Sequence, residues 1–394
     1  MSEIRPQCPL CAGEMKKNGK RNARTRWRCK NATCGVSEQT YRPDITAKHH
    51  FTYFHNHVTG IYPITECARL MKVSTRTVYR YFEPLWLIEI PNNPDRHRIH
   101  DQIFIDGTYT AAGCLLIAST PDHVLYWHWC KQETTHSYTQ LLSKLAAPLC
   151  LVLDGGQGAQ AAIKKLWPNT LIQRCLIHAQ RVVRRYVTSR PRTEAGREIY
   201  NLALELTSRE TVQQARKWAV DLHKYGIKHH DFLNEKTPLP PEIDRTGKRY
   251  EFTHRRVRSA YNSLTNLHKK GHLFIYLTPP KQAIDKKSWA SNTNRLEGGI
   301  NSQLKFIARC HRGRGGERQR KMLEWWLYNK TPLPDDPHKI ARQQNWGKDQ
   351  LAKVHVLTHT ENHTNHETGR PALYDNAIPT EYNHSVGIRK GTIR

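Results

Sequence analysis

The feature that most constrains the fold is a change of hydrophobic period near residue 100. Three short apolar runs bounded by Gly, Pro and Asp are typical of strands; they lie at residues 103–109, 113–119 and 124–129. Alternating helical and strand patterns follow, at residues 135–146 (helix), 150–153 (strand), 159–167 (helix) and 171–173 (strand). Adjacent strands followed by alternating helices and strands predict a single α/β core over residues 100–185.

This element order is that of a ribonuclease H-like core, in which the first and fourth strands are neighbours. Asp106 ends the short apolar run of the first predicted strand, and Asp154 ends the fourth strand. We therefore expect their carboxylates to lie side by side at the ends of the two strands. Each aspartate precedes a glycine, so each taken alone is also consistent with an ordinary turn.

A third acidic residue follows on a predicted helix in residues 289–330, the final part of the core. Its apolar stripe is Leu296, Ile300, Leu304 and Ile307. Glu297, Asn301 and Lys305 form an adjacent row at a spacing of four residues. Glu297 also follows Asn294 by three residues, which is consistent with a variant capping box instead.

Three convergent carboxylates suit the cutting and joining of phosphodiester bonds. Two divalent ions about 3.5–4 Å apart can activate the nucleophile and stabilise the leaving oxygen, and Mg²⁺ prefers oxygen ligands. We expect Mg²⁺ or Mn²⁺ at this site, with Asp106 bridging both ions, Asp154 holding one and Glu297 the other. The Gly155–Gly158 segment lacks the Gly-Lys-Ser/Thr ending of a phosphate-binding loop, so no nucleotide triphosphate is expected.

The charge indicates a polyanionic partner. The chain has 62 Lys and Arg against 34 Asp and Glu, a formal net charge of +28. Neutralising phosphates releases counterions and drives association, so we expect double-stranded DNA as the partner. A generic basic protein is the alternative, but the 10 Trp and 17 Tyr favour folded cores.

Two cysteine pairs in residues 1–47 predict a zinc ribbon. They are Cys8, Cys11, Cys29 and Cys34. Four thiolates suit structural Zn²⁺ and leave no open position for catalysis. The alternative is four unrelated free cysteines. The basic residues between the pairs are expected to contact DNA phosphates, or else to form a solvated charge run; they include Lys16, Lys17, Lys20, Arg24 and Arg26.

Residues 48–92 predict a helix-turn-helix. Residues 65–71 are amphipathic, residues 72–74 make the turn, and Ser74 is the expected N-cap of a second helix. This arrangement places the start of the second helix in the major groove of DNA. The side chains expected to face DNA are Thr75, Arg76, Thr77, Tyr79 and Arg80. An ordinary helical hairpin is the alternative.

The remaining segments have weaker signals. Residues 186–288 have mostly helical patterns and predict an all-helical insertion into the core. The basic run after the third acid adds Arg312 and Arg314 as DNA contacts. Residues 331–394 are rich in Pro, His, Asn and Thr and predict a poorly ordered tail. The absence of a signal peptide and of long apolar runs, with ten cysteines, predicts a cytoplasmic protein that contacts no membrane.

The segment Cys175-Leu176-Ile177-His178 follows the strand at 171–173. Two ligands do not make a zinc site. A buried cysteine beside a structural histidine is one interpretation. The other is a supporting role for Cys175, His178 and Asn301, in which His178 reaches the scissile phosphate or orients a carboxylate.

Together, these motifs resemble those of the bacterial insertion-sequence transposases of the Mutator-like DDE superfamily, in the variant with an N-terminal zinc ribbon. The resemblance covers roughly residues 5–330. It rests on four blocks, which are Ile105-Asp106-Gly107-Thr108, Leu153-Asp154-Gly155, Arg174-Cys175-Leu176-Ile177-His178-Ala179-Gln180-Arg181 and Thr293-Asn294-Arg295-Leu296-Glu297-Gly298-Gly299-Ile300-Asn301. The third block resembles a C-x-x-H signature, and the fourth an acidic Thr-Asn-x-x-Glu helix.

The resemblance implies cleavage at terminal inverted repeats, strand transfer by the freed 3′-OH and a homo-oligomer that pairs two element ends in the bacterial nucleoid. It also implies that the ribbon and the helix-turn-helix recognise those ends. Two other functions are consistent with the same residues. One is a non-enzymatic DNA-binding regulator with an inert core, and the other is a structure-specific nuclease that hydrolyses DNA without joining it.

Overall fold

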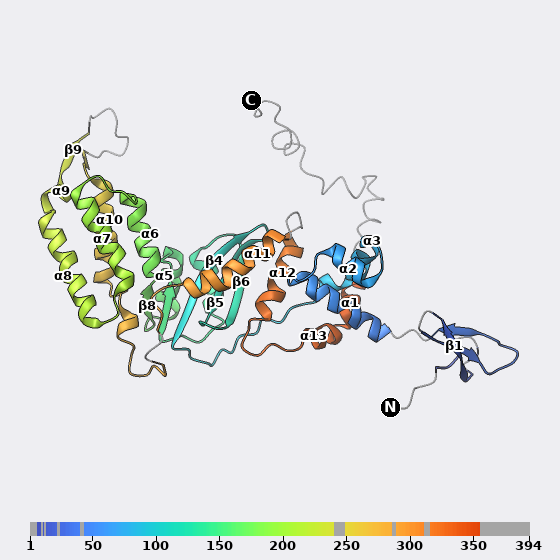
Figure 1. Ribbon diagram of the computed structural model, residues 1–394. Helices are drawn as coiled ribbons and strands as arrows, with labels where there is room; N and C mark the ends of the chain where they lie inside the picture. The colour runs from blue at the N-terminus through green and yellow to red at the C-terminus, as the bar shows by residue number, and fades with distance from the viewer. Residues whose placement is uncertain are drawn as a thin grey trace, which may run out of the picture. The chain divides into compact units, whose positions relative to one another are not determined.

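The computed structural model describes residues 6–8, 11, 13–21, 24–39, 43–239, 249–285, 289–310 and 316–354 (Figure 1). The chain divides into two compact units. The first contains residues 1–57, 61–88 and 335–394, and the second contains residues 58–60 and 89–334. None of the described helices is both long and apolar enough to cross a membrane.

The first unit begins with a small antiparallel sheet, in the order β1-β2-β3. Its strands are β1 (Met15–Arg21), β2 (Arg24–Cys29) and β3 (Ser37–Gln39). Met15 and Trp27 pack with Cys8 and Cys29 in a very small core. So small a core cannot supply much folding free energy, and a bound metal would supply it.

Three helices follow, α1 (Pro43–Val58), α2 (Ile64–Met71) and α3 (Thr75–Phe82), with the short helix η1 (Pro84–Leu87). Residues 72–74 join α2 to α3, and the Ser74 hydroxyl accepts a hydrogen bond from the Thr77 amide, as expected for an N-cap. Lys72 adopts a left-handed conformation that ends α2. Buried Ala68 and Val78 lie on the inner faces of the two helices.

The expectation of a poorly ordered tail from residue 331 differs from the structure over residues 337–354. Helices α13 (Pro337–Gln343) and η5 (Asn345–Gly347) are formed there, and the Trp346 ring lies 5.7 Å from the ring of Phe51 on α1. Gly347 has φ +75°, and a Cβ there would lie 1.9 Å from the Pro84 carbonyl oxygen. Composition alone did not reveal that two buried aromatic side chains hold this segment. Residues 355–394 lie outside the described part of the chain.

The second unit is α/β and contains a mixed five-stranded sheet in the order β6-β5-β4-β7-β8. The strands are β4 (Gln102–Thr110), β5 (Gly113–Ser119), β6 (Val124–Cys130), β7 (Cys150–Leu153) and β8 (Leu171–Arg174). Strands β4, β5 and β6 pair antiparallel, whereas β4, β7 and β8 pair parallel. The predicted strands and their order along the chain are confirmed.

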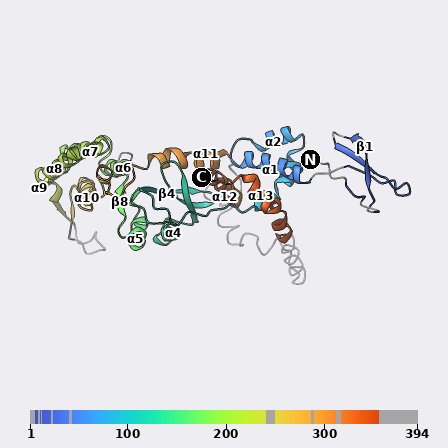
Figure 2. The ribbon, with the colours of Figure 1, turned by 90° about the horizontal axis from the view of Figure 1, so that it is seen from below.

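Helices cover both faces of this sheet (Figure 2). Helices α4 (Thr135–Leu142) and α5 (Gln157–Leu166) lie on one face, where Ile103 and Ile105 of β4 enter the main apolar core. The opposite face is covered by η4 (Arg295–Asn301), α11 (Ser302–Cys310) and α12 (Gly316–Tyr328). Because strand side chains alternate between faces, Asp106 lies on the opposite face from Ile105.

A mostly helical segment interrupts the core between β8 and η4, as predicted. Its secondary-structure content and its first residue differ from the prediction. Its helices are α6 (Leu176–Val187), α7 (Glu194–Glu205), α8 (Val212–Lys228), α9 (His230–Asn234) and α10 (Arg255–Lys269). It is not all-helical, because β9 (Lys236–Pro238) and β10 (Tyr250–Phe252) pair in an antiparallel ribbon. It also includes α6, whose Leu176 and Val183 pack in the same core as α7 and α10, so it begins ten residues before the predicted residue 186.

Candidate metal centre

Two of the three predicted acids belong to neighbouring strands, but Asp106 does not end its strand, because β4 continues to Thr110, whereas Asp154 directly follows β7. The parallel register of β4 and β7 pairs Gln102 with Cys150 and Phe104 with Val152. Continued along both strands, this register sets Asp106 beside Asp154. Both side chains are partly buried, and they interact strongly enough for Asp154 to raise the pKa of Asp106. The strand order therefore brings these two carboxylates together, as the sequence predicted.

The helix that carries the third acid crosses β4 at Asp106. Asn301, at the end of η4, is 2% exposed and donates a hydrogen bond of 2.6 Å from Nδ2 to Oδ2 of Asp106. The Oδ1 atom of Asn301 is buried and has no hydrogen-bond partner in the described part of the chain. η4 is a π-helix, a form often found at functional sites.

The π turn changes the expected row of Glu297, Asn301 and Lys305. Asn301 faces Asp106, Glu297 faces Arg181 on α6, and Lys305 is exposed. The capping box with Asn294 is not formed, because that side chain makes no cap hydrogen bond.

The carboxyl of Asp106 carries an uncompensated charge when ionised. Its pKa is raised from 3.8 to about 7, mainly by burial and then by the negative charge of Asp154, with a smaller contribution from Glu297. A buried carboxyl between other carboxylates holds its proton because its charged form is poorly solvated and repelled. A cation bound at this position would reverse both effects.

Glu297 has the opposite environment. Its Oε1 accepts a hydrogen bond of 2.6 Å from the Thr293 hydroxyl, and its Oε2 lies 3.1 Å from Nη1 of Arg181. Nδ1 of His178 lies 3.5 Å from Oε1. Burial, the largest single effect, raises the pKa of Glu297, but the Thr293 hydrogen bond and the charges of His178 and Arg181 together outweigh it and lower the pKa. Glu297 is therefore ionised at neutral pH.

Cys175 and His178 belong to the same cluster as Glu297. Cys175 is fully buried immediately before α6, and its Sγ accepts contacts from the Thr293 amide at 3.4 Å and the Thr293 hydroxyl at 3.3 Å. Burial raises the pKa of Cys175, but hydrogen bonds from His178 and Thr293 outweigh this and lower it. The hydrogen bond to Cys175 raises the pKa of His178 against the effect of burial. Each of the two groups thus favours the charged form of the other.

Ligand-type atoms of Cys175, His178 and Glu297 all lie within 4.8 Å of one another. Among the described residues, Asp106, Asp154 and Glu297 do not form an equally compact group. Glu297 is drawn toward Arg181 and Thr293, away from a shared position with the two aspartates. The interpretation that only two ligands are present at the C-x-x-H segment is incomplete, because the fold brings Glu297 to it as a third.

Two site residues were missed by reasoning from sequence. Thr293 bridges Cys175 and Glu297, and Arg181 pairs with Glu297. A signal was present for Thr293, which stands four residues before Glu297 and so on the same side of a helix. No signal at the level of sequence distinguishes Arg181 from the other basic residues of α6, because its partner lies 116 residues away.

A second candidate metal centre lies in the first unit. Sγ of Cys8 is 3.6 Å from Sγ of Cys34, and Sγ of Cys11 is 3.5 Å from Sγ of Cys29. All four sulfur atoms lie within 4.8 Å of one another. Tetrahedral Zn²⁺ with bonds of about 2.3 Å requires sulfur atoms roughly 3.8 Å apart. The four cysteines therefore fit a structural metal such as zinc.

The residues predicted to contact DNA are displayed on two elements. Those of the ribbon are exposed on the β1–β2 hairpin; they are Lys16, Lys17, Lys20, Arg24 and Arg26. Those of α3 are Thr75, Arg76, Tyr79 and Arg80, which are exposed, and Thr77, which is partly buried. Contact of these residues with DNA remains a prediction. Arg312 and Arg314 lie outside the described residues.

Comparison with known proteins gives no family for this chain. No protein-family model matches it, and no curated protein matches it.

Proposed function

We propose that the chain is a metal-dependent DNA transposase of the Mutator-like DDE type. The observation that carries the proposal is the parallel register of β4 and β7, together with the contact of η4 with Asp106 of β4. This register sets Asp106 beside Asp154, and η4 brings Asn301 and Glu297 to the same region. Carboxylates gathered at one edge of a sheet are the donor set that Mg²⁺ or Mn²⁺ prefers.

The sheet supports a ribonuclease H-like interpretation of the core. When the strands are numbered along the chain from β4, their order across the sheet is 3-2-1-4-5. Strands 1, 2 and 3 pair antiparallel, and strands 4 and 5 run parallel to strand 1. The helical group of α6–α10 stands between β8 and the helix that bears Glu297. Both features agree with what the sequence resemblance implies.

The residues around Asp106 fit a divalent cation. The raised pKa of Asp106 indicates negative potential that the charge of His178 only partly offsets, and Oδ1 of Asn301 is buried without a hydrogen-bond partner in the described part of the chain. Asp106 and Asp154 would hold the metal, and Glu297 would complete the set after it exchanges Arg181 for the metal. The bound metal would activate the attacking oxygen and stabilise the leaving oxygen.

The chain's own residues would position the acids. Asn301 orients the Asp106 carboxylate through its 2.6 Å hydrogen bond. Thr293 orients Glu297 and is itself held by the buried Cys175. These hydrogen bonds fix rotamers that a metal-binding constellation needs to hold within a fraction of an ångström.

Binding of element ends would use the other unit. The exposed basic hairpin of β1 and β2 would contact phosphates, and α3 would enter the major groove. Substrates would be the terminal inverted repeats of a bacterial insertion sequence and a target duplex, joined through the freed 3′-OH. Two ends would be paired by a homo-oligomer.

Cleavage and joining of labelled end DNA test this function. We expect Mg²⁺ or Mn²⁺ to support both reactions. Asp106→Asn, Asp154→Asn and Glu297→Gln should abolish them while DNA binding survives. Asp122→Asn, at an exposed turn, is the matched control and should leave activity intact.

Three outcomes separate the alternatives. Cleavage that persists in all three variants contradicts the site. Cleavage without strand transfer identifies a nuclease. DNA binding by the wild-type chain without any cleavage identifies a regulator.

A further inference from the structure

A small cavity adjoins the proposed catalytic edge. It has a volume of about 170 Å³ and lies between the loop after β7, α6 and the C-terminal part of α10. Its lining includes Gly155, the residue that follows Asp154, together with Arg174 and Lys270. The cavity therefore begins one residue from a proposed metal ligand.

Arg174 is built into the wall of this cavity. Its guanidinium lies across Gly155, so closely that a Cβ at residue 155 would be 1.4 Å from Nη1. Gly155 also has φ +97°, a conformation that glycine adopts readily. Nη1 is buried and has no hydrogen-bond partner in the described part of the chain. Because a guanidinium stays protonated in proteins, this is a fixed cation with an unused donor.

Lys270, exposed at the end of α10, is a second cation beside the cavity. The Gln160 amide and the Ser263 hydroxyl already donate hydrogen bonds to the carbonyls of Gly155 and Ala260. No residue that lines the cavity is acidic, although the nearby Asp154 interacts with the Arg174 guanidinium. A cavity with two cations and no carboxylate favours an anion.

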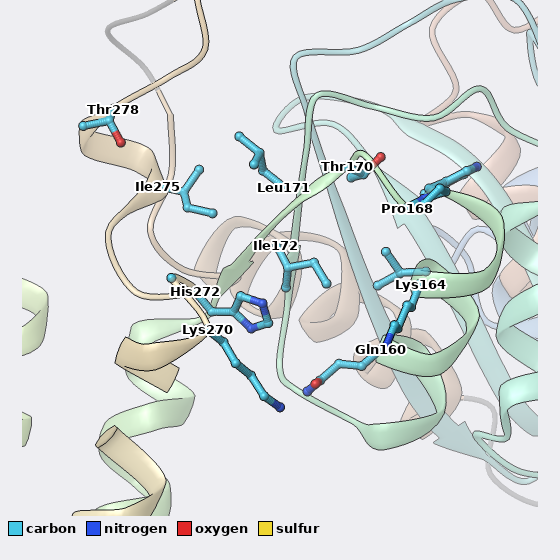
Figure 3. A pocket seen from close by; sticks show the side chains of 13 residues that line it. Gln160, Lys164, Pro168, Thr170, Leu171, Ile172, Lys270, His272, Ile275 and Thr278 are labelled. Atoms are coloured by element: carbon cyan, nitrogen blue, oxygen red, sulfur yellow. The ribbon is translucent and has the colours of Figure 1, made fainter. Parts of the chain in front are cut away.

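A larger cavity of about 760 Å³ continues from this one (Figure 3). Gln160 and Lys270 line both cavities, and their ends point toward one another in Figure 3. Lys164 and His272 also line the larger cavity. Burial lowers the pKa of His272, and the charges of Lys270 and Arg174 lower it further, which is consistent with a positive potential along the path.

We propose that the cavity formed by Arg174 and Lys270 binds a backbone phosphate of DNA close to the bond that is cut. The proposal rests on the proposed function and extends it by assigning a second anchoring point to the substrate. The anion would give the Arg174 guanidinium the acceptor that it lacks. A polymer is favoured over a free phosphate because cations line the adjoining cavity as well, where Lys164 accompanies Lys270.

Acylation of lysines, read by mass spectrometry, tests occupancy of the cavity in the full-length chain. The reaction is run without added Mg²⁺ or Mn²⁺, with a 30-base-pair duplex of random sequence, with inorganic phosphate, or with neither. We expect the duplex to slow acylation of Lys270 severalfold, relative to Lys224 on α8. Protection by inorganic phosphate alone would overturn the assignment to DNA. Absence of protection by either probe would overturn the site itself.

The salt dependence of duplex binding tests whether the contact is direct. Loss of one phosphate contact changes the slope of log K against log salt by about 0.9. We expect this change for Lys270→Ala, an exposed position whose loss leaves the fold intact. Lys269→Ala, the adjacent exposed lysine that does not line the cavity, should leave the slope unchanged. Equal slopes for Lys270→Ala and the wild type would contradict the proposal.

Both measurements are independent of catalysis because they are made without the divalent metal that cleavage requires. Protection of Lys270 and the slope change without any DNA cleavage would support this phosphate site and contradict the proposed function. DNA cleavage without the protection and the slope change would support the function and contradict this site.

Discussion

Asp106→Asn should stabilise the metal-free protein, although it removes a proposed metal ligand. The pKa of Asp106 lies near 7 instead of 3.8 because of burial and the nearby charges of Asp154 and Glu297. One pKa unit corresponds to about 1.4 kcal/mol, so the ionised carboxyl costs the fold about 4 kcal/mol. The neutral amide removes that cost and keeps an oxygen to accept the Asn301 hydrogen bond.

The pH dependence has a definite sign. Below the unfolded-state pKa near 3.8, Asp106 is neutral in both states and its full contribution to stability is present. As the pH rises through about 7, the folded protein must also ionise, and that contribution is lost. Asp106→Asn should therefore matter little at pH 4 and most at pH 8.

Differential scanning calorimetry at both pH values measures the effect. No Mg²⁺ or Mn²⁺ is added, and EDTA is omitted because it would also remove zinc from the four-cysteine site. A change of 1 kcal/mol corresponds to about 2–4 °C in Tm for a domain of this size, so about 4 kcal/mol corresponds to an increase of roughly 8–16 °C at pH 8. Added Mg²⁺ should stabilise the wild type by about 2.7 kcal/mol at one hundred times Kd and so raise its Tm, and it should leave the Tm of the variant unchanged. Asp122→Asn is the charge-matched control. A lower Tm for Asp106→Asn at pH 8 without added divalent metal would refute the electrostatic reasoning.

Three further predictions concern the surrounding structure. Thr293→Val removes the hydroxyl that bridges the buried Cys175 and the Glu297 carboxylate, a loss of about 1–3 kcal/mol. The cleavage rate constant should therefore fall roughly 5- to 150-fold, whereas Thr293→Ser should retain most activity. Cys29→Ser should abolish the binding of one zinc ion per chain, measured by elemental analysis. Cys67→Ser, at a buried cysteine of α2 outside this cluster, should leave the zinc content unchanged. Gly347→Ala should lower the Tm of the first unit by several degrees through steric overlap at positive φ, more than Gly35→Ala, where positive φ is combined with open space.

Much of the fold follows from local patterns. The core strands are short, and apolar runs bounded by Gly, Pro and Asp indicate them without tertiary information. Ser74 caps α3 because a hydroxyl before a helix satisfies an amide within the same turn. The end of β7 was predictable because its apolar run stops at Asp154, whereas β4 continues past Asp106 to Thr110.

Other features depended on residues that are distant in the sequence. The β9–β10 ribbon consists of two three-residue strands, too short to show a period. The packing of Trp346 against Phe51 joins segments almost 300 residues apart, and no local signal encodes that contact.

The amino-acid sequence by itself determined the core strands, the assignment of Asp106 and Asp154 to neighbouring strands, the four clustered cysteines and the charge of +28. Patterning, spacing and charge are local or additive properties. Only the tertiary structure decided that Glu297 joins Cys175 and His178, and that Arg174 passes beneath Gly155. These contacts depend on how the sheet register and the π turn direct side chains from separate elements. Their free energies arise from burial and like-charge proximity, which exist only after the elements have packed.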